Sequence, residues 1–453
     1  MLASFLFQEP TPEQAGSNYG GTERVHPLGL AALGILMLLM LVLPRRFAGL
    51  PIVLLLCFIP TGQRIVLITL DFTFIRLLLM AAWIRMFIRR EIVPLVWNSL
   101  DRTMVVWAIV SVLFGTLQLA TLTGFINRAG MTGDAMMTYF FFRMTIRKKE
   151  DLAAIALQFI LSGMAVVWFF LFENRTQTNM FHIFGGVERF TEIRDGRLRC
   201  QGAFAHPILA GCFWACCLPF YFLRGQLGKG WFLTVVGAIA AGAIIVLCAS
   251  STPIMAVVFG LCAVGAWFIR GSLRWVRWLI LLWLMVLHFF MMKQPVWHLL
   301  ARIDIAGGST GWHRYHLVDE AINHFYEWWA VGTPRTGHWG IGLQDVTNQY
   351  VAEAIQGGVW RLIVFAMAVW YAFAGVSRSM RMPGLPRADR LVAWGLGTAV
   401  FMHCMNFIGV SYFEQIYTLW YLTLAAIGSL TLVPGASAVQ QVSLISPYAL
   451  QRA

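Results

Sequence analysis

Apolar runs separated by short polar breaks recur along this chain from residue 28 to residue 432. A helix needs roughly 20 apolar residues to cross the hydrocarbon core of a bilayer, with about 17 as the lower limit. The second run is too short to cross unaided, so the first two runs form either two spans or one span with a re-entrant piece. We therefore expect an all-α polytopic membrane protein with about 12–13 transmembrane helices. The candidate spans are 28–44, 49–61, 66–84, 103–122, 130–145, 152–172, 207–223, 231–249, 254–269, 276–292, 353–376, 390–410 and 413–432.

Composition excludes a soluble fold for a chain of this length. Of the 453 residues, 59% are hydrophobic and only 12% are charged, a balance that is not typical of soluble domains. Seven of the eight cysteines lie in apolar runs, and Cys200 alone lies in a polar segment. No cysteine spacing resembles a disulfide framework or a zinc site. We expect no metal and no cofactor.

The net charge of +13 is distributed between the spans and does not form a nucleic-acid-binding face. Basic residues gather in every second break, at 45–46, 85–90, 147–149, 224–229, 270–277 and 378–390. This alternation follows the positive-inside rule, which assigns those breaks to the cytoplasm. We therefore expect the lipid bilayer and no nucleic acid as a partner, with the N-terminus outside and the C-terminus inside.

Both ends of the chain are predicted to be tails. Residues 1–26 contain several prolines and glycines. They have no basic region before an apolar core, so we interpret them as a mobile tail and not as a cleavable signal peptide. Residues 27–432 are predicted to form the transmembrane domain, followed by a cytoplasmic tail over 433–453.

Two connections on the predicted outer side, 173–206 and 293–345, are longer than ordinary connections. The second is rich in arginine, histidine and tryptophan, in contrast to the apolar runs around it. Its apolar positions at helical spacing predict a surface helix over 316–325, and glycines at 332, 337, 340 and 342 interrupt regular structure after it. Such a loop can fold over a cavity as a lid or wall, and we expect the functional residues there.

Several segments between about residues 139 and 360 carry a specific resemblance. Arg199-Cys200-Gln201-Gly202-Ala203-Phe204-Ala205-His206-Pro207 stands directly before an apolar span, and Arg314 lies seven residues before Ala321 in the predicted surface helix. The large loop ends in Asn348-Gln349-Tyr350, followed by Glu353-Ala354-Ile355-Gln356-Gly357-Gly358. An aromatic run that ends at Arg143, followed by Lys149-Glu150-Asp151, completes the pattern. Together these segments resemble the superfamily of O-antigen ligases and O-antigen polymerases.

The resemblance implies a glycosyltransferase that acts on the periplasmic side of the bacterial inner (cytoplasmic) membrane. Such enzymes transfer a glycan from an undecaprenyl-diphosphate carrier to an acceptor, without a metal or a nucleotide sugar. Their fold, similar to the GT-C type, is all-helical with a large periplasmic loop. Arg199 and Arg314 match arginines that are thought to hold the donor diphosphate. Ligases of the superfamily often carry His immediately before the Asn, where this chain has Thr347, and this departure favours a polymerase.

The arginines suit this chemistry on physical grounds as well. A lipid diphosphate is a large anion at the membrane surface, and guanidinium groups bind phosphate oxygens in a bidentate manner while staying charged. Arg199 and Arg314 are therefore the expected clamps, and Arg335 and Arg302 are further candidates. Alternatively, each arginine reaches lipid headgroups or pairs with a carboxylate of the large loop, and for Arg302 and Arg335 we favour this alternative.

A sugar hydroxyl that acts as a nucleophile benefits from a nearby base or hydrogen-bond acceptor. The candidates are His313, His316, His338, Asp345 and Glu353. We predict a catalytic set of Arg314, His338 and Asp345, in which His338 replaces the missing His of the superfamily. His206 either caps the following helix or binds substrate, and the tryptophans either stack on sugar rings or anchor the loop at the membrane interface. The predicted substrate-binding residues are Arg199, His206, His316, Arg335, Trp339, Asn348 and Tyr350.

Three classes of function follow. The preferred one is a polymerase of undecaprenyl-diphosphate-linked repeat units of an O-antigen or exopolysaccharide, with a chain-length regulator and a flippase as implied partners. An O-antigen ligase that transfers the glycan to lipid A core is the alternative within the same superfamily. A flippase or transporter of the lipid-linked glycan is the second alternative; the polar content is concentrated in one outer loop without an evident internal repeat, which favours the enzyme. A scaffold subunit of an export complex is the third alternative.

Overall fold

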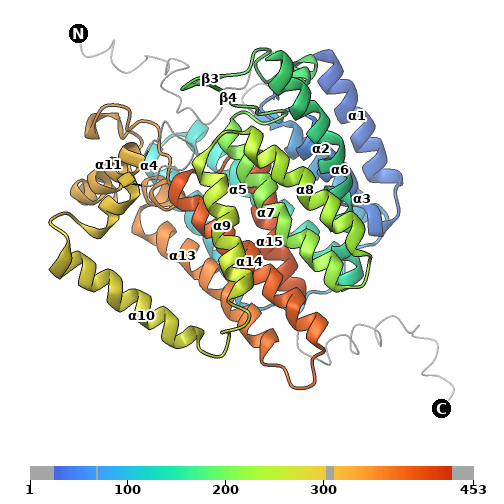
Figure 1. The fold of residues 1–453 in the computed structure, drawn as a ribbon. Coiled ribbons are helices and arrows are strands. Elements are labelled where there is room, and N and C mark those ends of the chain that lie inside the picture. Colours follow the sequence, from blue (N-terminus) through green and yellow to red (C-terminus); the bar gives the residue numbers. More distant parts are fainter. Residues whose placement is uncertain (1–24, 68–69, 303–310, 431–453) are drawn as a thin grey trace, which may run out of the picture.

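The computed structural model describes residues 25–67, 70–302 and 311–430. Within these ranges the chain is mainly helical and forms one bundle (Figure 1). Six described helices are long and apolar enough to cross a membrane: α4 (Ser99–Leu119), α6 (Lys149–Thr176), α7 (Pro207–Gln226), α10 with its following turn (Leu273–Met291), α13 (Gln349–Met380) and α14 (Arg387–Gly409). The prediction of an all-α, multi-pass membrane protein is therefore confirmed. The predicted tails lie outside the described residues, except for Val25 and His26.

The remaining bundle helices are shorter or more polar. They are α1 (Pro27–Val42), α2 (Leu50–Phe58), α3 (Phe74–Ile88), α5 (Leu122–Thr145), α8 (Trp231–Leu247), α9 (Ser251–Gly265) and α15 (Gln415–Leu430). Helix α2 has nine residues, which gives a length of only about 13 Å. As expected from the short run at 49–61, this helix cannot cross a bilayer core of about 30 Å by itself.

The predicted span at 66–84 is wrong at its start. Strands β1 (Arg64–Leu67) and β2 (Leu70–Thr73) form an antiparallel hairpin, and α3 begins only at Phe74. The polar residues in the run explain the difference. Arg64 donates to the Asp71 carboxylate across the hairpin at 3.0 Å, and the Thr73 hydroxyl caps the first turn of α3.

The connections that carry the basic residues lie at one end of the bundle, which we call the basic end, and ion pairs join them to one another. Arg45 of the α1–α2 break pairs with Asp151 at the start of α6, at 3.1 Å. Lys149 of the same helix pairs with Asp389 at the start of α14, at 2.5 Å. The connection 177–206 and the described parts of the large connection, 292–302 and 311–348, lie at the opposite end, which we call the loop end (Figure 1). The alternation of basic breaks seen in the sequence thus corresponds to two distinct ends.

The connection 177–206 carries a small hairpin of strands β3 (Ile193–Arg194) and β4 (Arg197–Leu198). The large connection contains α11 (Gly311–Asn323) and α12 (Phe325–Trp328). Helix α11 therefore includes residues 311–315, which the sequence pattern had left outside the predicted helix at 316–325. After α12 the chain is irregular apart from one short turn at Gly337–Trp339, as its glycines predicted. This loop has a small hydrophobic core of its own against α13: Leu317, Ala321, Trp328, Trp339, Leu343, Val351 and Ala354.

Helix α13 is broken where this loop contacts it. Gly357 and Gly358 leave the helical conformation, and Gly358 has a positive φ of 69°. The segment after α12 fills the break: Thr333 donates its backbone N–H to Ile355 O, and Val359 donates to Trp329 O, both at 2.9 Å. A Cβ at Gly358 would lie 2.6 Å from Ala330 O. Glycine is therefore required for this close approach.

Helix α10 differs from the other spans because none of its residues is buried. Figure 1 shows it standing apart from the rest of the bundle, beyond α13. Its exposed side chains are large and apolar, including Trp275, Trp278 and Leu282. Such a surface is compatible with lipid and not with water. Helix α10 is joined to the bundle through its two ends.

Candidate functional site

A buried carboxylate holds the segment that places Arg199 and His206. Both oxygens of Glu173, near the end of α6, accept backbone N–H groups, from Gln201 and Gly202, at 3.0 Å. Gly202 has a φ of +60°, and a Cβ there would lie 2.4 Å from the Phe170 ring. No larger residue fits without displacing this ring. The segment before α7 is thus fixed by contacts with α6.

Arg199 and His206 lie at the two ends of this segment. The Arg199 side chain is buried and pairs with Glu192 at 2.9 Å, while the Glu192 side chain is 46% exposed. His206 caps α7 by accepting the Ile208 N–H at Nδ1, at 3.2 Å. Burial, followed by the charge of Arg199, lowers the pKa of His206 to about 4. The imidazole is therefore neutral at pH 7, and its helix-capping role is observed.

Arg314, on α11, is buried at the loop end. Its Nε donates to Gly409 O, at the end of α14, at 3.1 Å, and its Nη2 donates to the Thr252 hydroxyl of α9 at 3.0 Å. Both acceptors are neutral. Among the described residues no carboxylate forms an ion pair with Arg314, so the expected alternative of pairing with a loop carboxylate is not observed. Burial lowers the pKa of Arg314, in keeping with a cation that is short of compensation.

Arg194 of the β3–β4 hairpin lies near both His206 and Arg314. After burial and Arg199, it lowers the pKa of His206, and after burial it also lowers the pKa of Arg314. Its own side chain is 39% exposed. Arg194 and Arg199 thus lie near His206, and Arg194 also lies near Arg314, which stands more than a hundred positions later in the sequence. We call Arg194, Arg199, His206 and Arg314 the arginine cluster.

The other predicted catalytic residues lie within the large loop. His338 Nε2 lies 2.8 Å from the Glu327 carboxylate, and its side chain is 52% exposed. The same carboxylate accepts the Trp339 indole N–H at 2.9 Å. Burial raises the pKa of Asp345, whose backbone oxygen lies 3.0 Å from His313 Nε2. His338 is thus a histidine with a carboxylate partner at the loop surface.

The predicted substrate-binding residues occupy different settings. Trp339 is buried in the small core of the loop and stacks on His324 with ring centroids 5.3 Å apart. His316 is partly exposed and lies 3.8 Å from Glu320. Arg335 is exposed. None of these three contacts the arginine cluster through a described hydrogen bond or ion pair.

Asn348 and Tyr350 join α13 to α14. Asn348 caps α13 by accepting the N–H groups of Tyr350 and Val351, and it donates to Ile408 O at 3.2 Å. The Tyr350 hydroxyl donates to Cys404 O at 3.3 Å. Both side chains therefore support the packing of these helices at the loop end.

The negative charge of Glu353, the remaining candidate base, is compensated by an arginine. It lies one turn further along α13 and pairs with Arg361 at 2.8 Å, with both side chains almost fully buried. Trp107 and Gln349 also donate hydrogen bonds to its carboxylate, at 3.1 and 2.8 Å. A carboxylate with this many donors belongs to a structural network.

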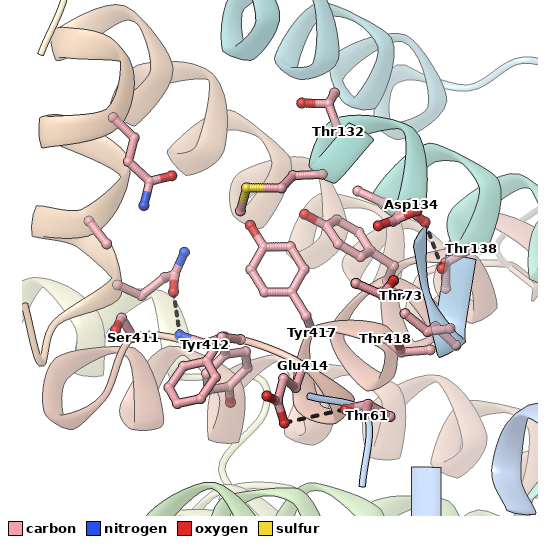
Figure 2. A pocket seen from close by; sticks show the side chains of 18 of the residues that line it. Thr61, Thr73, Thr132, Asp134, Thr138, Ser411, Tyr412, Glu414, Tyr417 and Thr418 are labelled. Carbon is pink, nitrogen blue, oxygen red and sulfur yellow. Dashed lines mark hydrogen bonds between the residues drawn. The ribbon is translucent and has the colours of Figure 1, made fainter. Parts of the chain in front are cut away.

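A cavity lined by polar and aromatic side chains lies against residues 411–414, enclosed by the β1–β2 hairpin, α4, α5, α13 and α15 (Figure 2). The space inside it, including its open mouth, is about 1140 Å³. The sequence analysis did not predict it, because its lining comes from six separate segments. The labelled lining residues in Figure 2 are Thr61, Thr73, Thr132, Asp134, Thr138, Ser411, Tyr412, Glu414, Tyr417 and Thr418.

Glu414 is the functional candidate that sequence reasoning missed. It ends the short connection 410–414 between α14 and α15, and its φ of +55° is left-handed, a conformation that costs a non-glycine residue about 1–3 kcal/mol. The Thr61 hydroxyl donates to its carboxylate at 3.3 Å. Burial raises the pKa of Glu414 to about 7. Its only sequence signal was a lone carboxylate in a short outer break.

Hydrogen bonds from three directions fix the 410–414 connection. Arg314 holds its start through Gly409 O. The Tyr412 N–H donates to the Gln349 side chain at 2.7 Å, and Gln415, directly after Glu414, donates to Ala203 O at 2.8 Å. Ala203 belongs to the segment that carries Arg199. The arginine cluster and the cavity therefore contact the same short connection.

The chain matches no family model and no curated protein. Its function therefore has to be argued from the site itself. Among the described residues no group of three or more histidine, cysteine, aspartate or glutamate side chains is arranged to hold a metal ion. The chemically distinctive features are a buried arginine that has no carboxylate partner among the described residues, a histidine–carboxylate pair on the large loop, and a cavity whose lining includes the carboxylates of Asp134 and Glu414.

Proposed function

We propose that this protein is a membrane glycosyltransferase that polymerises undecaprenyl-diphosphate-linked oligosaccharide repeat units of a surface polysaccharide, an O-antigen or exopolysaccharide. The observation that carries the proposal is the arginine cluster. Arg314 is buried and its described hydrogen bonds go to neutral oxygens, while Arg194 adds positive charge near it. Burying a cation without a counter-ion is costly. A diphosphate that reaches the cluster supplies the missing negative charge.

The chemistry is a single group transfer. The acceptor hydroxyl forms a bond to the anomeric carbon of the donor glycan, and the bond from that carbon to the diphosphate oxygen breaks. The lipid diphosphate leaves with the electron pair, and the arginines stabilise its charge. The hydroxyl proton passes to a base, for which we propose His338. Glu327, 2.8 Å away, orients this imidazole and stabilises it once it is protonated.

We also propose a membrane topology and a cellular setting for the protein. The bundle is a GT-C-type fold with about 12–13 crossings of the bacterial inner membrane. The basic end faces the cytoplasm by the positive-inside rule, so the loop end and the arginine cluster face the periplasm. Partners in this setting are the undecaprenyl-diphosphate-linked glycan, a flippase that delivers it and a chain-length regulator.

Reconstitution with a lipid-diphosphate-linked repeat unit tests the proposal. The wild type is expected to form a ladder of lengthened lipid-linked glycans, resolved by gel electrophoresis, and Arg314→Ala and Arg199→Ala are expected to lose it. Arg189→Ala is the matched control, because Arg189 is exposed on the same connection as Arg199 and the variant loses the same charge. Equal activity in all three variants contradicts the arginine clamp.

The same assay separates the alternatives. Transfer of the glycan to lipid A core, with no ladder, identifies a ligase. Transbilayer movement of the lipid-linked glycan without any new glycosidic bond identifies a transporter and rejects the enzyme.

A further inference from the structure

The cavity under the 410–414 connection has a lining that selects for a particular class of ligand. Its hydroxyl and amide groups come from every enclosing segment except α4: Thr61, Thr73, Thr132, Thr138, Gln349, Gln356, Ser411 and Thr418. Aromatic side chains alternate with them: Trp107, Tyr412, Phe413, Tyr417 and Tyr421. Saccharides present hydroxyl groups at their edges and C–H groups on the faces of their rings. Polar groups beside aromatic faces complement both surfaces.

Three of the five charged residues of the lining are compensated by ion pairs within the protein. Arg64 pairs with Asp71 at 3.0 Å, and Arg361 pairs with Glu353 at 2.8 Å. Asp134 accepts two hydrogen bonds from Arg76, each at 2.8 Å. These pairs leave the walls polar without a strong net charge. The lining therefore favours a neutral ligand over a charged one, in contrast to the arginine cluster.

Two lining residues carry charge outside these pairs. Arg128 donates to the Gln356 amide oxygen at 3.1 Å and has a further interaction within the protein. For Glu414, the described hydrogen bond comes from the Thr61 hydroxyl. A carboxylate has about four lone-pair positions, so Glu414 retains capacity to accept from a ligand. Figure 2 shows its side chain beside Thr61 at the edge of the cavity.

The protein holds Glu414 in place against an unfavourable backbone conformation. Its left-handed φ persists because Gln349, Arg314 and Gln415 fix the residues on either side. Strain of this kind clusters at binding and catalytic positions. The carboxylate is thus preorganised for an interaction that the rest of the lining does not make.

We propose that this cavity binds a neutral saccharide and that the Glu414 carboxylate accepts a hydrogen bond from one of its hydroxyl groups. The inference rests on the proposed function in one respect: the saccharide is then the acceptor end of the growing glycan, held beside the donor diphosphate. Gly409, which Arg314 binds, lies five residues before Glu414. Five residues span at most about 18 Å, so the two sites are neighbours.

Saturation-transfer NMR on the full-length protein in nanodiscs tests the site directly. The probes are a panel of neutral di- to hexasaccharides and the matching oligosaccharides that contain uronic acids. We expect neutral members to bind, and Glu414→Gln to weaken this binding about tenfold, the order of effect of one hydrogen bond to a charged group. Thr418→Val, which removes a cavity hydroxyl at nearly constant shape, is expected to weaken it as well.

Glu188→Gln is the matched control, since Glu188 is exposed on the connection 177–206, and it is expected to bind as the wild type does. The inference is overturned if no neutral saccharide binds, if acidic members bind better, or if Glu414→Gln and Thr418→Val leave binding unchanged. The transfer assay is read separately. Saccharide binding without any transfer rejects the proposed function and keeps the site, whereas transfer without saccharide binding in this cavity rejects the site alone.

Discussion

Glu414 makes the stability of this protein depend on pH in a direction that one substitution can test. Its pKa is about 7 in the folded protein, against an ordinary value of 4.5. Between these values the folded state binds a proton that the unfolded state has released. The stabilisation from protonated Glu414 is therefore complete below about pH 4.5 and is lost as the pH rises through about 7.

The size of the effect follows from the same two values. The difference between about 7 and 4.5 corresponds to about 3 kcal/mol, at about 1.4 kcal/mol for each pKa unit. Because Glu414 is only partly buried, solvent screening reduces this to about 1–3 kcal/mol. Glu414→Gln removes the ionisation and keeps the shape, so the variant is expected to gain stability over the wild type as the pH rises from 5 to 8.

Thermal unfolding in detergent, followed by tryptophan fluorescence at a fixed scan rate, measures this difference. The melting temperatures of wild type and Glu414→Gln are expected to lie close together at pH 5 and to separate by a few degrees at pH 8. Glu188→Gln, an exposed counterpart, is expected to follow the wild type at every pH. Parallel curves for wild type and Glu414→Gln refute the reasoning, since they mean that Glu414 titrates equally in the folded and unfolded states.

Three further predictions concern the supports of the site. Gly202→Ala places a Cβ 2.4 Å from the Phe170 ring at a left-handed φ, so we expect a lower melting temperature by fluorescence and loss of transfer in the reconstituted assay. Arg361→Met leaves Glu353 buried without its counter-ion, which is expected to destabilise the protein by about 3–5 kcal/mol. In thermal unfolding, the double variant that also carries Glu353→Gln is expected to recover part of this lost stability. No recovery contradicts the ion pair. Arg314→Lys keeps the charge but cannot donate to both Gly409 and Thr252 in the same geometry. We therefore expect the transfer rate to fall at least about tenfold. A rate equal to that of the wild type contradicts the geometric requirement.

The apolar runs predicted most of the helices because a bilayer forces each crossing segment to satisfy its backbone hydrogen bonds internally. The prediction failed at 66–73, where a polar hairpin precedes α3, because hydropathy averaged over a run does not detect an Arg64–Asp71 pair across a turn. Arg199 and Arg314 were selected as candidates through the sequence motifs around them. Their surroundings were not predicted, since contacts such as Arg314 to Gly409 join segments 95 positions apart.

The cavity was beyond sequence reasoning for a related reason. No single helix contributes more than three of the lining threonines, tyrosines and amides, and such residues are unremarkable in any one helix. Glu414 carries no motif and stands in a break of five residues. Its importance comes from burial, from its left-handed backbone and from the three hydrogen bonds that fix the connection, all of which depend on the assembled bundle.

The break in α13 has a consequence for how the protein is made. The backbone groups freed at Gly357 and Gly358 are met by Trp329 and Thr333, which leave the ribosome earlier. The large loop has no partner for these groups until α13 has been inserted behind it. The loop therefore reaches its final form only after translation has passed α13. Protection of the loop from protease during synthesis thus marks the moment at which this part of the chain is complete.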